Sequence, residues 1–80
     1  MASSNLSDKP IGVLGAGNFG TVIANILAQN RPVLLYARNP EVVRQINEQR
    51  ANRGHHIEPG VKAVNDLSEV ARSCDVIFPM

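Results

Sequence analysis

Hydrophobic and polar positions alternate in blocks along the chain, and each block has the length of a strand or a helix. Short apolar runs are typical of buried parallel strands, because both faces of a parallel sheet are covered. Apolar residues spaced three and four positions apart instead predict amphipathic helices. The apolar runs that predict strands are residues 11–14, 33–36, 61–64 and 75–78.

Two of the helices predicted between these strands are long and amphipathic. The first spans about residues 19–29, and the second begins at Asn39-Pro40. Asparagine caps helices well, and proline suits the first helical position. Gly54 is the expected terminator of the second helix, and residues 55–60 are expected to form a loop. The apolar positions of the first helix are Val22, Ile23, Ile26 and Leu27.

The last predicted helix is short and runs from Asp66 to about Arg72. Asp66 and Glu69 have the spacing of a capping box, in which the two side chains satisfy free amides at the helix start. Strands that alternate with helices imply a parallel sheet with right-handed crossovers. In a doubly wound α/β sheet, the four strands would lie side by side in the order 3-2-1-4.

A glycine-rich turn joins the first strand to the first helix. Residues 15–20 match G-x-G-x-x-G, with a buried strand directly before and an amphipathic helix directly after. Gly15 allows the tight turn, Gly17 lets a pyrophosphate approach the backbone, and Gly20 lets the helix pack closely on the strand. The free N–H groups from Asn18 onward would point at the phosphates. This context predicts the N-terminal part of a Rossmann-type domain that binds NAD(P)H.

The residue after the second strand bears on the choice of cofactor. Domains that use NAD place Asp or Glu there to bind the ribose 2′-hydroxyl, whereas this chain has Ala37 followed by Arg38. An arginine can bind a 2′-phosphate through bidentate bonds. We therefore expect NADP(H) ahead of NAD(H), with Arg50 as a weaker second phosphate contact. Arg44 and Arg53 are interpreted as solvated surface charges.

Composition excludes several other classes of protein. The chain has 80 residues and a net charge of +1, with no cluster of basic residues for nucleic acid and no apolar stretch that could span a bilayer. We expect a flexible leader over residues 1–9 and the nucleotide-binding domain over residues 10–80. Cys74 is the single cysteine, which fits a reducing cytoplasm. His55 and His56 lack further ligands at metal-binding spacing, so no metal site is expected.

No catalytic residue is predicted within the chain, because no acid–base constellation is visible. The predicted elements make up only the first half of a dinucleotide fold, plus one strand whose outer edge would be unpaired. The expectation is therefore that the sequence is part of a longer protein, with its catalytic residues and substrate domain beyond Met80.

Residues 11–21, IGVLGAGNFGT, resemble the opening V-L-G-A-G-S-W-G-T-A-L-A of bacterial NAD(P)-dependent glycerol-3-phosphate dehydrogenases. Residues 35–40, 46–52 and 64–67 are similar to the family's L-W-A-R-D-P, I-N-x-x-R-x-N and A-T-S-D-L. Together these stretches extend the resemblance over nearly all of residues 10–80. The segment over residues 55–60 departs from it, because the family has Y-L-P-G and more residues there.

The resemblance implies a cytoplasmic enzyme that transfers a hydride between NAD(P)H and dihydroxyacetone phosphate. The product, sn-glycerol 3-phosphate, would serve glycerophospholipid synthesis. Asn18 and Phe19 occupy the family's Ser and Trp positions at the pyrophosphate, and Arg38 occupies its 2′-phosphate position. The family's catalytic lysines have no counterpart here, so the chain by itself is expected to be inactive. A homodimer through a C-terminal domain stays open.

Two alternatives remain at this point, because fold alone does not fix function. One is another reductase of the same broad superfamily, of the ketopantoate or pyrroline-carboxylate type. The other is a non-catalytic NAD(P)-binding regulatory module, which would bind the cofactor without turnover. The sequence beyond Met80 would separate the enzymes by their catalytic groups.

Overall fold

The predicted strands form one parallel sheet in the computed structural model, which describes residues 9–80. The strands are β1 (Ile11–Leu14), β2 (Val33–Tyr36), β5 (Val61–Val64) and β6 (Val76–Pro79). They lie in the order β5-β2-β1-β6, which confirms the expected order 3-2-1-4 and the Rossmann-type topology. Apart from Lys9, the expected leader lies outside the described residues.

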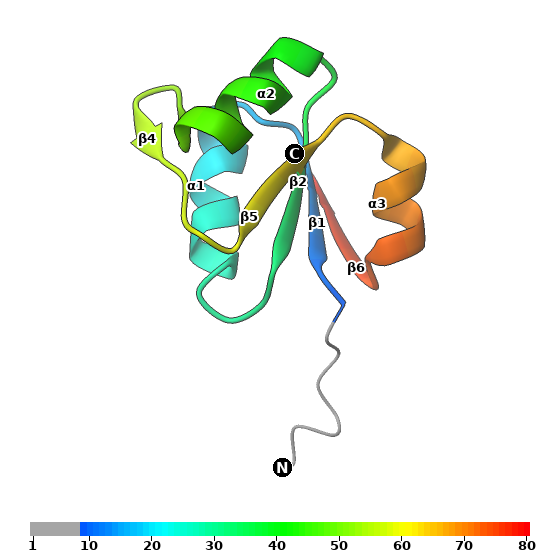
Figure 1. Ribbon diagram of the computed structural model, residues 1–80. Helices are drawn as coiled ribbons and strands as arrows, with labels where there is room; N and C mark the ends of the chain where they lie inside the picture. The colour runs from blue at the N-terminus through cyan, green and yellow to red at the C-terminus, as the bar shows by residue number, and fades with distance from the viewer. Residues whose placement is uncertain (1–8) are drawn as a thin grey trace.

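Helices cover both faces of this sheet (Figure 1). On one face lie α1 (Asn18–Leu27) and α2 (Pro40–Gln49), and on the other lies α3 (Leu67–Ser73). Because side chains alternate across a strand, β1, β2 and β5 contribute to both layers, whereas the residues of β6 are exposed. The layer under α1 and α2 contains the larger core, with Val13, Leu35 and Ile46 fully buried. The layer under α3 is smaller and is built on Leu34, Val64 and Val70.

The predicted cap residues of the second and third helices are confirmed, but within residues 9–80 the Glu69 side chain does not complete the expected capping box. The Asn39 side chain accepts a hydrogen bond from the Glu41 amide at 2.9 Å, and Pro40 opens α2. The Asp66 side chain accepts from the Ser68 amide at 2.9 Å at the start of α3. Hydrogen bonds from the Ser68 hydroxyl and amide hold the pKa of Asp66 below its ordinary value. Both caps therefore satisfy amides that the helices leave free.

The expected end of the second helix is wrong in its detail. The cap is Arg50, which adopts a left-handed conformation (φ 56°, ψ 40°), and Gly54 lies four residues further on. This conformation is costly for a non-glycine residue. It is held because the Arg50 guanidinium donates to the carbonyls of Glu58 and Val61, at 2.7 and 2.9 Å.

A short hairpin replaces the first part of the loop expected over residues 55–60. Strand β3 (Ala51–Asn52) pairs antiparallel with β4 (His55–His56). The two residues between them, Arg53 and Gly54, have φ angles of 52° and 81°. Positive φ at both central residues is what a type I′ hairpin turn requires, so Gly54 serves this turn and does not end α2.

The apolar face of α1 also differs from the expectation at one position. Ile26 is 54% exposed, whereas Ala24 is completely buried. The small side chain of Ala24 packs in the core beneath α1. Ile26 lies two positions further on, roughly 200° around the helix axis, so it points away from the sheet. Of the helices within residues 9–80, none is long and apolar enough to cross a membrane.

Candidate functional site

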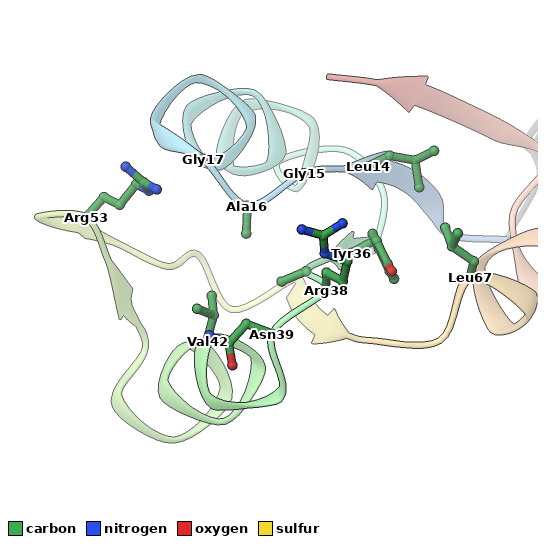
Figure 2. A pocket seen from close by; sticks show the side chains of 11 residues that line it. Leu14, Gly15, Ala16, Gly17, Tyr36, Arg38, Asn39, Val42, Arg53 and Leu67 are labelled. Atoms are coloured by element: carbon green, nitrogen blue, oxygen red, sulfur yellow. The ribbon is translucent and has the colours of Figure 1, made fainter.

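A pocket of about 750 Å³ opens at the carboxyl ends of β1 and β2 (Figure 2). Ligands of doubly wound sheets bind at this edge, where the strand order reverses. The pocket contains the glycine turn, the segment that follows β2, and the tip of the β3–β4 hairpin, and none of its side chains is acidic. Its lining consists of Leu14, Gly15, Ala16, Gly17, Tyr36, Ala37, Arg38, Asn39, Val42, Arg53 and Leu67.

The three motif glycines occupy different environments in the turn. Gly15 has φ of 127°, a conformation that side chains rarely adopt. A Cβ on Gly20 would lie closer than 3.0 Å to the Gly15 carbonyl oxygen, so α1 could not pack where it does. A Cβ on Gly17 would meet nothing within 4 Å. The fold therefore needs Gly15 and Gly20, whereas Gly17 leaves open space above the start of α1.

A buried asparagine that the sequence analysis did not select braces this turn. Asn52 is 5% exposed, and its side-chain amide donates to the Ala16 carbonyl and to the Thr21 hydroxyl, both at 2.8 Å. Thr21 in turn donates to the Gly17 carbonyl at 2.7 Å. These bonds hold two successive carbonyls of the turn in place. Because Asn52 and Ala16 are 36 residues apart, no local pattern could reveal their contact.

The predicted cofactor arginines separate in space. Arg38 lines the pocket directly after Ala37, which is 6% exposed and leaves no carboxylate at the ribose-reading position. Arg50 does not line the pocket, since its guanidinium binds the carbonyls that hold the chain after α2. Arg53, interpreted from the sequence as a surface charge, is exposed but lines the pocket from the hairpin.

Asn18 and Phe19 lie at the start of α1 but not among the pocket-lining side chains. The Asn18 side chain lies 2.7 Å from His55 Nε2, and Phe19 is 69% exposed. Their backbone amides belong to the first turn of α1, whose N–H groups have no acceptor within the helix. These amides and the positive end of the helix dipole make the turn attractive to an anion.

The remaining candidate side chains stay apart from the pocket. Cys74 packs with the smaller core, and burial raises the pKa of its thiol, which disfavours the reactive thiolate. His56 pairs with Glu58 at 2.7 Å on the surface. Within residues 9–80, no three histidine, cysteine or acidic side chains are grouped to hold a metal ion.

Comparison with known proteins agrees with this architecture. In a crystal structure of glycerol-3-phosphate dehydrogenase from Coxiella burnetii, the matching part has a TM-score of 0.75 and 26% sequence identity. The match covers 90% of this chain and 24% of that protein.

Sequence relatives carry the same name. The glycerol-3-phosphate dehydrogenase [NAD(P)+] of Pseudomonas paraeruginosa is 43% identical over 75 residues, and that of Caulobacter vibrioides is 44% identical over 75 residues. Each match covers 88% of this chain and 22% of the relative, so the chain spans about a fifth of the length of these proteins. Residues 10–80 match the family model for the N-terminus of NAD-dependent glycerol-3-phosphate dehydrogenase, and the chain belongs to this family.

Proposed function

We propose that residues 10–80 bind NADP(H), and NAD(H) more weakly, as the cofactor-binding part of a cytoplasmic dehydrogenase. The enzyme would reduce dihydroxyacetone phosphate to sn-glycerol 3-phosphate for glycerophospholipid synthesis. The observation that carries this proposal is the pocket itself, in which a glycine turn at a helix start faces Arg38 and no carboxylate is present. Its volume of about 750 Å³ lies in the range of ordinary cofactor and ligand sites.

The residues of the pocket fit a dinucleotide part by part. The open space at Gly17 accommodates a pyrophosphate against the first amides of α1. Arg38, two residues after β2, would bind a 2′-phosphate, and the Ala37 side chain offers no acceptor to a free 2′-hydroxyl. The bound dinucleotide would supply the hydride, while these residues bind and orient it. Residues 10–80 are assigned no acid–base chemistry and no substrate binding.

Binding and turnover can be tested separately. The chain should bind NADPH in a fluorescence titration yet show no oxidation of NADPH at 340 nm with dihydroxyacetone phosphate. A chimaera in which residues 10–80 replace the matching segment of the Pseudomonas paraeruginosa relative should oxidise NADPH with dihydroxyacetone phosphate. A chain that turns over the substrate alone would contradict this division of labour. A folded chimaera that binds NADPH but does not reduce dihydroxyacetone phosphate would contradict the proposed substrate.

Arg38→Gln should weaken NADPH binding by about tenfold or more, because a charge-assisted bond to the 2′-phosphate is lost. NADH lacks that phosphate, so its dissociation constant should stay within about twofold. Titration of the variant with both dinucleotides measures the change in preference. Arg44→Gln is the matched control, since Arg44 pairs with Glu41 and Glu48 on the exposed side of α2. Equal weakening of both dinucleotides by Arg38→Gln would contradict the role in 2′-phosphate binding.

A further inference from the structure

The arginines of this chain fall into two groups by their contacts. Outside the pocket, each arginine donates a hydrogen bond within the chain: Arg31 to Asp75, Arg44 to Glu41, Arg50 to the Val61 carbonyl, and Arg72 to Ser68. Arg38 and Arg53 form no hydrogen bond or ion pair within residues 9–80, and both line the pocket. Among the arginines of residues 9–80, the two without an internal hydrogen-bond or ion-pair partner are therefore the two that line the pocket.

The placement of Arg53 is fixed by the hairpin that carries it. Asn52, the preceding residue, binds the Ala16 carbonyl, and His55 lies 2.7 Å from the Asn18 side chain on α1. A side-chain bond from Asn25 to the His56 carbonyl, at 2.8 Å, holds the far strand. These contacts hold the hairpin against the glycine turn from both of its strands, so the tip with Arg53 stays beside the turn.

The backbone at Arg53 is unfavourable for an arginine. Its φ of 52° is in the left-handed region, where glycine and asparagine are better suited. No side-chain hydrogen bond or ion pair within residues 9–80 offsets this, in contrast to Arg50, whose side chain makes two hydrogen bonds in a similar conformation. The guanidinium at this position therefore has no structural role within the described chain.

Figure 2 shows the Arg53 side chain on the side of the pocket where Ala16 and Gly17 lie, whereas Arg38 lies next to Tyr36. We propose that Arg53 is a second phosphate-binding arginine, which binds the pyrophosphate beside the glycine turn and the first amides of α1. This inference rests on the proposed binding of NAD(P)H. The pyrophosphate is common to NADH and NADPH, so Arg53 contributes to affinity and Arg38 to the choice between the two.

The test is a titration of the chain with NADPH and with NADH in three variants. Arg53→Asn removes the charge and keeps a residue that tolerates the left-handed turn, so its melting temperature should stay at or above that of the wild type. It should weaken the binding of NADPH and of NADH by about tenfold each, leaving the ratio of the two dissociation constants unchanged. Arg53→Lys, which keeps the charge, should lose about threefold or less in affinity for either dinucleotide. Arg44→Gln should change neither affinity.

Each contrary result is distinct. Binding by Arg53→Asn within twofold of the wild type would show Arg53 to be a solvated charge and overturn the inference, while NADPH binding by the wild type stands. Weakening of NADPH alone would assign Arg53 to the 2′-phosphate and also overturn it. Equal losses of dinucleotide affinity in Arg53→Asn and Arg53→Lys would show that the positive charge does not contribute to binding, and would overturn the inference. A wild-type chain that binds neither dinucleotide would remove the proposed function, and this inference with it.

Discussion

Gly20→Ala is expected to lower the free energy of unfolding by about 3 kcal/mol, at the upper end of overpacking substitutions. The added Cβ would lie closer than 3.0 Å to the Gly15 carbonyl oxygen, which is backbone and cannot rotate away. Either α1 moves off β1 or the glycine turn distorts, and both changes affect the pocket. Urea unfolding followed by circular dichroism measures the loss of stability. Titration with NADPH should show weaker binding as well.

Gly17→Ala is the matched control for this substitution. A Cβ at Gly17 meets nothing within 4 Å, and its φ of −75° suits any residue. The variant should lose at most about 1 kcal/mol, from a poorer cap of α1. It should nevertheless bind NADPH more weakly, because the methyl group occupies the space proposed for the pyrophosphate. An unfolding midpoint of Gly20→Ala equal to that of the wild type would mean that the turn absorbs the clash.

Asn52→Ala should cost about 2–3 kcal/mol, because it removes two hydrogen bonds and leaves the Ala16 carbonyl without that donor. The turn would lose its brace, so NADPH affinity should fall by more than the tenfold expected for a single phosphate contact. The changes are measured by urea unfolding and by NADPH titration of the variant under conditions where it remains folded.

Asn47→Ala separates loss of stability from loss of the site. Asn47 also makes two side-chain bonds to backbone, to the amide and carbonyl of Ala63 at 2.8 and 2.9 Å, but away from the pocket. It should therefore destabilise the chain and leave the NADPH dissociation constant of the folded protein unchanged. If Asn47→Ala and Asn52→Ala weaken NADPH binding by the same factor, the effect of Asn52→Ala comes from general destabilisation.

The sequence alone determined the three helices and the four strands of the parallel sheet, but not the β3–β4 hairpin. Each strand is a local apolar run, and the caps at Asn39 and Asp66 depend on residues within two positions of the helix start. The glycine motif, between β1 and α1, located the turn at the correct edge of the sheet. These features could be predicted because periodicity, capping and turn geometry are all set by residues close together in the chain. The order β5-β2-β1-β6 then agreed with the order 3-2-1-4 expected of a doubly wound sheet.

Only the tertiary structure decided which side chains surround the pocket. The sequence favoured Arg50 over Arg53 as a phosphate contact, yet Arg50 binds the carbonyls of Glu58 and Val61, and Arg53 lines the pocket. Asn52 braces a turn 36 residues away, and its contact exists only after the hairpin folds back onto α1. The physical reason is that the side-chain hydrogen bonds of Arg50 and Asn52 depend on partners that only the fold brings together, whereas hydrophobic periodicity and helix caps are fixed by neighbours.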